Sequence, residues 1–455
     1  MKINFVHKFE NIISLENLLC AWQEFIKGKR SKKDTQEFSL NLMDNIFSLH
    51  ADLSQHKYKH GTYQAFNICD PKPRNIHKAT VRDRLMHHAI YRILYPFFDK
   101  LFISDSFSCR LNKGTHRAIN RFKSFSNQVS KNNTRTCWVL KCDIKKFFAS
   151  IDHEILKSIL KEYILDKNVL WLLENVINSF HSTRSGIGLP LGNLTSQLLV
   201  NIYMNEFDQF VKHQMKAKYY IRYADDFVFL SEDRNYLEEQ IDPIVCFLSE
   251  KLKLNLHPKK VFIKTLASGV DFLGWIHFFD HRILRTTTKR RMFKKIQTNM
   301  KSGTIPSYLG LLKHGNTYKI KLKLQNMTEQ LKKTILLVED DQFLSVLLKN
   351  RLVQEGFNVL LAITGDEALK ILETHKPNLI LMDIILPVKS GFETMESIIA
   401  NPKYGKVPTM IVSNLGQESD IAKGRELGAV EYFVKAQTPI DEMIKKIKEF
   451  LSVKS

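Results

Sequence analysis

The chain has 455 residues and a formal net charge of +21 at pH 7; 44% of its residues are hydrophobic and 25% are charged. This balance is typical of a folded, water-soluble protein of two to four domains. No run of about 18 apolar residues occurs, so we expect no membrane span. The N-terminal stretch lacks the features of a signal peptide. Six cysteines without a CxxC pair favour free thiols and a cytoplasmic location.

The positive charge is concentrated in the N-terminal part of the chain. Residues 1–330 contain 52 basic and 30 acidic residues, whereas residues 331–455 contain 16 basic and 17 acidic ones. A basic region of this size most often binds a polyanion, usually nucleic acid. A basic surface that is merely solvated is the alternative that charge alone leaves open.

Composition and apolar spacing divide the chain into five segments and predict a multi-domain α/β fold. A helical N-terminal region is expected over 1–60, followed by mixed strand and helix patterns over 61–280. The segment 281–328 is strongly basic, and 329–333 reads as a linker. Over 334–455, apolar strand cores alternate with helices, which predicts a doubly wound (βα)5 domain with a parallel sheet.

Two carboxylate sites lie in the second of these segments. Asp143 ends an apolar run that predicts a buried strand, and Asp225 and Asp226 occupy the turn of a predicted hairpin. Phosphoryl transfer to a 3′-hydroxyl uses two divalent cations about 3.5–4 Å apart, and Mg²⁺ prefers carboxylate oxygens. Acids from separate strands can hold such a pair. A solvated Asp-Asp turn is the alternative, and it would be favoured if this dipeptide occurred alone.

The order of motifs over residues 60–325 resembles that of reverse transcriptases. A basic segment, a strand ending in Asp, a Gly-rich turn before a helix, an aromatic-x-Asp-Asp hairpin, a lysine pair and FLGW follow one another. Several motifs in the same order are far more specific than any one of them. The resemblance implies a right-hand polymerase with fingers and palm over 61–280 and a short basic thumb over 281–328. It also implies an RNA-directed DNA polymerase that binds a template RNA, a cDNA primer duplex and dNTPs.

The same resemblance implies roles for individual residues. Asp143, Asp225 and Asp226 match the catalytic acids, which together with the Ile144 carbonyl would hold two Mg²⁺ ions. Phe148 matches a steric gate that favours dNTPs over rNTPs; a core aromatic ring is the alternative. For any one arginine near the triphosphate, a surface salt bridge is an equal alternative. The residues expected around the bound nucleotide are Arg74, Lys78, Arg82, Phe148, Leu191, Gly192, Gln197, Lys259 and Lys260.

Further positions indicate the type of reverse transcriptase. Gly274 in VDFLGW matches the primer grip, where glycine permits close approach to the primer end. Gln197 stands where most relatives have proline, and residues 307–321 resemble a thumb segment of diversity-generating retroelements. Leu191 replaces a polar glutamine of retroviral enzymes, which favours loose base selection. We therefore expect error-prone copying in such a retroelement, with a small basic accessory protein as a partner. A retron-like or phage-defence polymerase, and an RNA-binding protein that does not polymerise, are the alternatives.

Residues 334–455 resemble the receiver domain of response regulators over essentially their whole length. Glu339 and Asp340 end the first predicted strand and Asp383 ends the third, and these ends converge in a sheet of order 2-1-3-4-5. The resemblance implies one Mg²⁺ at these acids and phosphorylation of Asp383 by a histidine kinase or another phospho-donor of a two-component system. Ala436 occupies a position that is usually proline. The residues matching the family's switch positions are Ser413, Tyr432 and Lys435.

Overall fold

The computed structural model describes residues 3–68, 74–298, 304–331, 333–404 and 407–453. Two compact units make up the chain, Met1–Thr317 and Tyr318–Ser455. Their boundary falls inside the basic segment that the sequence marked as a thumb, so the last helix of that segment belongs to the second unit. In the described part of the chain, no helix is both long and apolar enough to cross a membrane.

Helices form the N-terminal region, and the second of them packs against a long helix that follows the first hairpin. Leu18, Ala21 and Phe25 recur every three or four residues and are completely buried, so one helix face lies in the core. The Asn17 side chain donates to the Ala89 carbonyl of the long helix at 3.2 Å. These elements are α1 (Phe9–Ile13), α2 (Leu15–Phe25), α3 (Lys33–Leu40), α4 (Leu42–Ser54), β1 (Gln64–Ile68), β2 (Arg74–Lys78) and α5 (Val81–Leu101).

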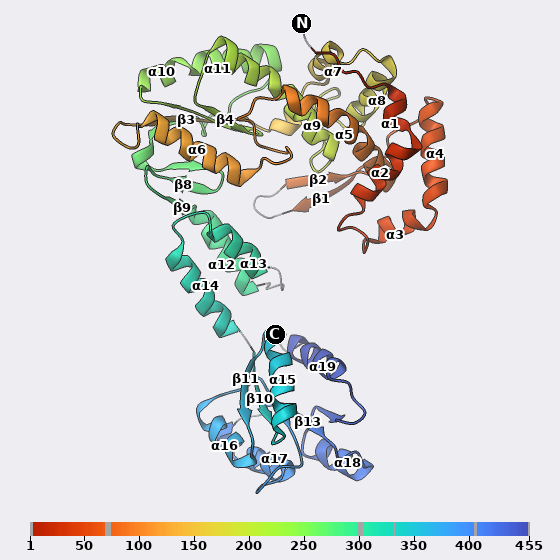
Figure 1. The fold of residues 1–455 in the computed structure, drawn as a ribbon, viewed down its shortest axis with the longest axis vertical. Helices are drawn as coiled ribbons and strands as arrows, with labels where there is room; N and C mark the ends of the chain where they lie inside the picture. The colour runs from red at the N-terminus through yellow and green to blue at the C-terminus, as the bar shows by residue number, and fades with distance from the viewer. Residues whose placement is uncertain (1–2, 69–73, 299–303, 332, 405–406, 454–455) are drawn as a thin grey trace. The chain divides into compact units, whose positions relative to one another are not determined.

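An antiparallel sheet of order β4-β5-β3-β6 lies between α6 and α11 in the first unit (Figure 1). Along β3, Val139 packs in the core that includes α6, whereas Leu140 packs in the core that includes α9 and α11, because successive strand side chains point to opposite faces. Helices therefore cover both faces of this sheet. The elements are β3 (Trp138–Asp143), β4 (Tyr220–Tyr223), β5 (Asp226–Ser231), β6 (Phe262–Thr265), α6 (Thr115–Val129), α9 (Leu194–Gln209) and α11 (Ile241–Leu252).

A smaller antiparallel sheet of order β7-β8-β9 completes the first unit with its flanking helices. Helix α9 ends at Gln209, and a π-helical turn, Phe210–Gln214, continues it. The remaining elements are α7 (His153–Tyr163), α8 (Lys167–Asn178), α10 (Arg234–Glu239), β7 (Val270–Phe272), β8 (Trp275–His277), β9 (Arg282–Leu284), α12 (Thr286–Thr298) and α13 (Thr304–Leu312).

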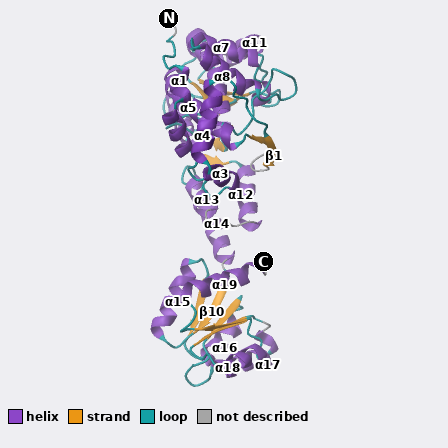
Figure 2. Cartoon of the chain, turned by 90° about the vertical axis from the view of Figure 1, so that its right-hand side faces the viewer, coloured by secondary structure: helices purple, strands orange, loops and turns teal. Residues whose placement is uncertain are grey.

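The second unit begins with α14 (Tyr318–Leu331), which includes part of the predicted linker, and continues with a parallel sheet of order β11-β10-β12-β13-β14. The predicted order 2-1-3-4-5 is thus confirmed. Along β10, Ile335 packs with α15 and α19, and Leu336 packs with α16 and α17 on the other face; Figure 2 shows these strands between helices. The elements are β10 (Thr334–Val338), α15 (Gln342–Gln354), β11 (Asn358–Ala362), α16 (Gly365–Thr374), β12 (Leu379–Met382), α17 (Gly391–Ala400), β13 (Thr409–Ser413), α18 (Glu418–Glu426), β14 (Glu431–Val434) and α19 (Ile440–Val453).

Candidate functional site

Strand pairing in the first unit brings the three predicted catalytic acids together. Asp143 is the last residue of β3 and lies directly opposite Asp226, the first residue of β5. The backbone amide of Ile144 donates to the carbonyl of Asp225 at 3.1 Å. Ala224, in the turn before these acids, has a φ of 56°, a left-handed conformation that costs energy in a non-glycine residue and often marks a functional turn. The register of two strands therefore fixes the relative positions of the acids.

Burial and mutual repulsion make this acidic cluster costly without cations. Burial, together with the neighbouring charges of Asp226 and Asp143, raises the pKa of Asp225 to about 6. Burial also raises the pKa of Asp226, against the opposing effect of the Lys141 charge. Divalent cations would relieve this repulsion, and Mg²⁺ prefers such carboxylate oxygens. The donor set of the site therefore fits Mg²⁺.

Two lysines compensate part of the negative charge. The Lys260 ammonium lies 2.7 and 2.8 Å from the two carboxylate oxygens of Asp143. The buried Lys141 ammonium lies 3.3 Å from Oδ1 of Asp226 and donates to the Asp271 carbonyl of β7 at 3.0 Å. Lys141 was not among the predicted site residues. Its position two residues before Asp143 on a strand was the available signal, because residues i and i+2 share a face.

A buried ion pair supports the turn that carries Asp225. The guanidinium of Arg222 donates to both carboxylate oxygens of Asp208, with distances of 2.8 and 2.7 Å for the shortest contact to each. Its Nη1 donates to the Ala224 carbonyl at 3.2 Å. The Tyr220 hydroxyl donates to the same aspartate at 2.8 Å. Both charged side chains are almost fully shielded from solvent, so the pair anchors the hairpin from inside the core.

The predicted nucleotide-pocket segment packs against strand β2. The amide of His77 donates to the Leu191 carbonyl at 3.1 Å, and the Asn193 side chain donates to the His77 carbonyl at 3.0 Å. Gly192 has a φ of 104°, and a Cβ there would lie 2.8 Å from Cγ2 of Ile76. A side chain at this position would displace the Ile76 methyl group, and the positive φ itself favours glycine. The β1–β2 hairpin and the Leu191 segment are therefore held as one surface.

Other predicted positions lie at ends and turns of the same unit. Phe148 is half-buried, and its carbonyl accepts from Leu189 at 2.8 Å; Phe147 beside it is the core ring. Gln197 lies in the first turn of α9, where its carbonyl accepts from the Asn201 side chain at 3.2 Å. Gly274 occupies the tight turn between β7 and β8 with a φ of 87°.

The predicted triphosphate-contacting cations are not gathered at the acids. Lys78 forms an ion pair with an aspartate of α3 at 2.7 Å, and Arg82 pairs with an aspartate of α4 at 2.5 Å. Arg74 and Lys259 are exposed. Among the predicted triphosphate-contacting cations in the described residues, only Lys260 forms an ion pair with a predicted catalytic acid. The contact roles of the other four cations stay predictions.

The second unit holds a separate acidic cluster at the carboxyl ends of its strands. Glu339, Asp340 and Asp383 each offer a carboxylate oxygen, and these atoms lie within 4.8 Å of one another. Glu339 and Asp383 are buried, whereas Asp340 is exposed. A buried oxygen of Glu339, Oε2, has no hydrogen-bond partner. An unpartnered buried carboxylate oxygen at such a cluster fits a bound cation, and hard oxygen ligands suit Mg²⁺.

Lys435 links the acids of this cluster. Its ammonium lies 2.7 Å from Oε1 of Glu339 and 2.6 Å from Oδ2 of Asp383. Burial raises the pKa of Glu339 to about 7, although the bond to Lys435 opposes this rise. The Ser413 hydroxyl accepts from the Leu415 amide at 3.4 Å, and the Tyr432 hydroxyl donates to the Leu415 carbonyl at 2.9 Å. Of the predicted switch residues, Ser413 and Tyr432 thus bond to the loop at Leu415, and Lys435 bonds to the acidic cluster.

Comparison with known families identifies both parts of the chain. Residues 59–277 match the family described as "Reverse transcriptase (RNA-dependent DNA polymerase)", and residues 335–448 match the "Response regulator receiver domain" family. Protein YkfC of Escherichia coli K12 is 26% identical over 255 residues, which cover 48% of this chain and 65% of that protein. This similarity by itself assigns no role of that protein to the present chain.

The C-terminal part is similar to many regulators. The probable transcriptional regulator ycf29 of Porphyra purpurea is 33% identical over 117 residues, covering 26% of this chain and 56% of that protein. A solved receiver domain protein from Methanospirillum hungatei JF-1 is 30% identical, with a TM-score of 0.25; the match covers 27% of this chain and 94% of that one. The chain spans less than two thirds of the two curated relatives named above.

Proposed function

We propose that this chain, in which a reverse transcriptase domain precedes a response regulator receiver domain, copies RNA into DNA. The observation that carries the proposal is the placement of Asp143 opposite Asp226 in the β3–β5 register, with Asp225 in the adjoining turn. A domain of this family implies a nucleic acid template, a primer and nucleotides as partners. The excess of basic residues in the first 330 positions supports binding of a polyanionic duplex.

Asp143, Asp225 and Asp226, together with the Ile144 carbonyl, are the groups proposed to hold two Mg²⁺ ions. When bound, these ions would activate the attacking 3′-hydroxyl and stabilise the charge of the leaving pyrophosphate. Lys260 at present neutralises Asp143, and the same ammonium would be available to an anionic leaving group once cations take its place. The aromatic ring of Phe148 is proposed to exclude a 2′-hydroxyl from the nucleotide pocket.

Primer extension on an RNA template tests this proposal. We expect Asp225→Ala to abolish extension, because the cluster loses one of its three carboxylates. The matched control is Asp242→Ala, which removes an exposed aspartate from the first turn of α11 and should leave extension unchanged. Extension that survives in the Asp225 variant would remove the site assignment and favour an RNA-binding protein that does not polymerise.

The receiver domain implies a phospho-donor kinase, and we propose that phosphorylation of Asp383 regulates the polymerase. A phosphoryl group adds about −1.5 to −2 charges beside Lys435, whose ammonium already lies 2.6 Å from this carboxylate. The test is to treat the protein with acetyl phosphate and Mg²⁺ and to compare extension rates with those of Asp383→Asn. A rate that changes in the parent protein and stays constant in the variant is the expected result. Equal rates in every condition would contradict regulation.

Error-prone copying is proposed from Leu191, which lies on the surface shared with β2 and offers no hydrogen-bonding side chain. A site that cannot hydrogen-bond a base discriminates poorly between bases. We expect Leu191→Gln to lower the error frequency of cDNA copied from a defined RNA, with adenines as the main positions of error. Sequencing of the products measures this, and unchanged fidelity would remove the argument.

A diversity-generating retroelement is the proposed genetic setting, supported by the sequence of residues 307–321 and by Gln197. Such an element would supply the template RNA and a small basic accessory protein. The neighbouring DNA tests this directly: near-identical repeats that differ at adenines are expected. A retron-type RNA gene or phage-defence genes in their place would assign the polymerase to one of those systems.

A further inference from the structure

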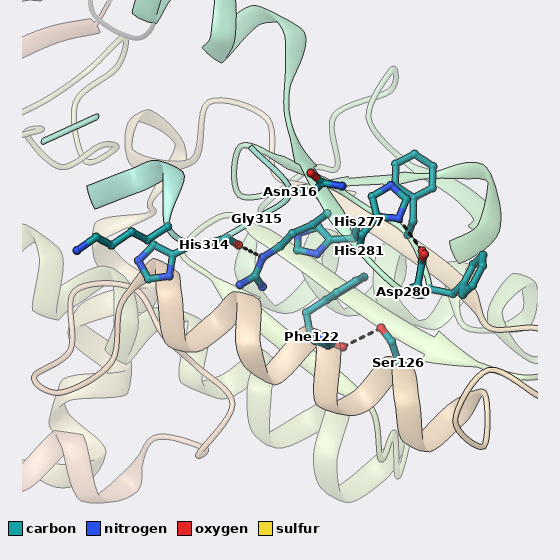
Figure 3. A pocket seen from close by; sticks show the side chains of 13 residues that line it. Phe122, Ser126, His277, Asp280, His281, His314, Gly315 and Asn316 are labelled. Carbon is teal, nitrogen blue, oxygen red and sulfur yellow. Dashed lines mark hydrogen bonds and ion pairs between the residues drawn. The ribbon is translucent and has the colours of Figure 1, made fainter. Parts of the chain in front are cut away.

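A cavity of about 330 Å³ lies in the first unit, away from the predicted catalytic residues in sequence and lined by none of them. Figure 3 shows its position between α6, which contributes Phe122 and Ser126, the turn after β8, and the loop that contains His314. Its volume falls within the range of small-molecule sites, about 300–1,000 Å³. Residues 278–282 and 313–316 form most of its wall and lie outside both family matches.

The wall of this cavity is fixed by close backbone contacts. The amide of Asn316 donates to the Arg282 carbonyl at 2.9 Å, and Nε of Arg282 donates back to the His314 carbonyl. A Cβ on Gly315 would lie 2.2 Å from the ring of Trp275, which is fully buried. The loop and strand β9 are therefore clamped together, and the cavity is a built feature of the fold.

The charge of the cavity favours an anion. Lys123, Arg282 and Lys313 line it, and within the described ranges no carboxylate forms an ion pair with any of them. The one acidic lining residue, Asp280, is hydrogen-bonded to His281 at 2.6 Å. Nη1 of Arg282 is buried and has no hydrogen-bond partner. A buried guanidinium nitrogen without a partner is costly, and an anionic ligand would satisfy it.

The rim of the cavity is aromatic. The rings of Phe278 and His281 stack with their centroids 4.8 Å apart and an interplanar angle of 13°. Phe279 beside them is 48% exposed, so its ring is open to a ligand at the rim. The pKa of the neighbouring His277 is lowered to about 4, chiefly by burial and partly by the Arg282 charge. His277 therefore stays neutral at pH 7 and adds a further flat ring without a charge.

We propose that this cavity binds a nucleotide, with its phosphate at Arg282, Lys123 and Lys313 and its base against the aromatic rim, where the exposed ring of Phe279 lies beside the Phe278–His281 stack. Cations for the phosphate and flat rings for the base are the two features that nucleotide recognition requires. Either a free mononucleotide or one nucleotide of a bound RNA strand has this chemistry. The site is separate from the proposed catalytic acids, so occupancy does not depend on polymerisation.

Photo-crosslinking of the full chain to a short single-stranded RNA that contains 4-thiouridine tests the proposal, with the crosslinked peptides mapped by mass spectrometry. EDTA is present throughout, so that extension plays no part in the result. We expect crosslinks in the peptide that contains Phe278–Arg282, and we expect Phe279→Ala to reduce them about tenfold, the scale of one base–aromatic stack. Lys123→Ala and Lys313→Ala should also reduce them, whereas the matched control Lys251→Ala, an exposed lysine of α11, should not.

The source of the nucleotide is decided by competition and by direct binding. Crosslinks at this site that AMP displaces, or AMP binding by calorimetry that Lys123→Ala weakens, support the proposal with a free nucleotide as ligand. Crosslinks that AMP leaves unchanged support it with a nucleotide of the RNA strand as ligand. The proposal is overturned if no crosslink maps to Phe278–Arg282 and AMP does not bind, or if Lys251→Ala reduces both signals as much as Lys123→Ala. The variants alter exposed side chains, so melting temperatures equal to that of the parent show that each one folds.

Discussion

Replacement of Arg222 by methionine should destabilise the first unit strongly and disturb the catalytic turn. The substitution leaves the carboxylate of Asp208 in the core without its cation. The side chain of Arg222 is only 1% exposed and that of Asp208 is 0% exposed. Removal of one partner from a buried pair costs about 3–5 kcal/mol. For a unit of this size, that loss lowers the melting temperature by roughly 10 °C. The hydrogen bond from Arg222 to the Ala224 carbonyl is also lost, so we expect primer extension to fall even where the protein remains folded.

Calorimetric melting and extension assays on the full chain measure both effects. The double variant Arg222→Met with Asp208→Leu removes both charges, and we expect it to recover at least about 2 kcal/mol of the loss, because no unpaired charge then remains in the core. It should not recover the extension rate, because the turn still lacks its hydrogen bond. A single variant that loses under about 1 kcal/mol, or a double variant less stable than the single one, would refute the reasoning, given the usual size of such couplings.

Three further predictions follow from single contacts. Lys260→Ala removes the ammonium that competes with Mg²⁺ for Asp143. The Mg²⁺ concentration giving half-maximal extension should fall roughly two- to fivefold, because a partly exposed pair contributes up to about 1 kcal/mol. A rise in this concentration would contradict the competition. Burial lowers the pKa of His277 from 6.5 to about 4, so the folded state takes up this proton only at lower pH than the unfolded state. The free energy of unfolding should therefore drop by up to about 3 kcal/mol as pH falls from 6.5 to 4. Urea unfolding should show this slope, reduced in His277→Asn. Gly315→Ala forces a Cβ against the buried Trp275 ring; it should cost about 1–3 kcal/mol and speed proteolysis of that loop, whereas equal cleavage would show that the loop adapts.

Much of the fold follows from local sequence patterns. The alternation of apolar strands and helices after residue 334 predicted the parallel sheet and its order, because each strand such as ILLV (335–338) is buried on both faces. The predicted turn at Asp225 and Asp226 likewise corresponds to the β4–β5 hairpin. In each case the apolar spacing of neighbouring residues was sufficient.

Helix boundaries and irregular turns were harder to predict from the sequence. The sequence marked residues 329–333 as a linker, yet α14 extends to Leu331. A short polar stretch has adequate helix propensity, so local composition did not distinguish a linker from a helix end. The π-helical turn after Gln209 likewise leaves no clear signature in the sequence. These features depend on how neighbouring elements pack.

The candidate sites show the same division. The sequence alone supplied Asp143, Asp225 and Asp226, since strand ends and hairpin turns can be read from period-two patterns. It also supplied the acids and Lys435 of the second unit. It did not supply Lys141, the Arg222–Asp208 pair or the partners of Lys78 and Arg82, because each of these contacts joins residues far apart in the chain.

What the sequence determined by itself is which side chains are available at the ends of strands, because the alternation of apolar residues within a strand is a local property. What the tertiary structure decided is which of those side chains share a space: the β3–β5 register placed Asp143 beside Asp226, and a loop clamped onto β9 created a cationic cavity around Arg282. Burial and charge–charge interactions act between segments distant in sequence. The free energy that they cost or contribute is therefore determined only by the folded arrangement.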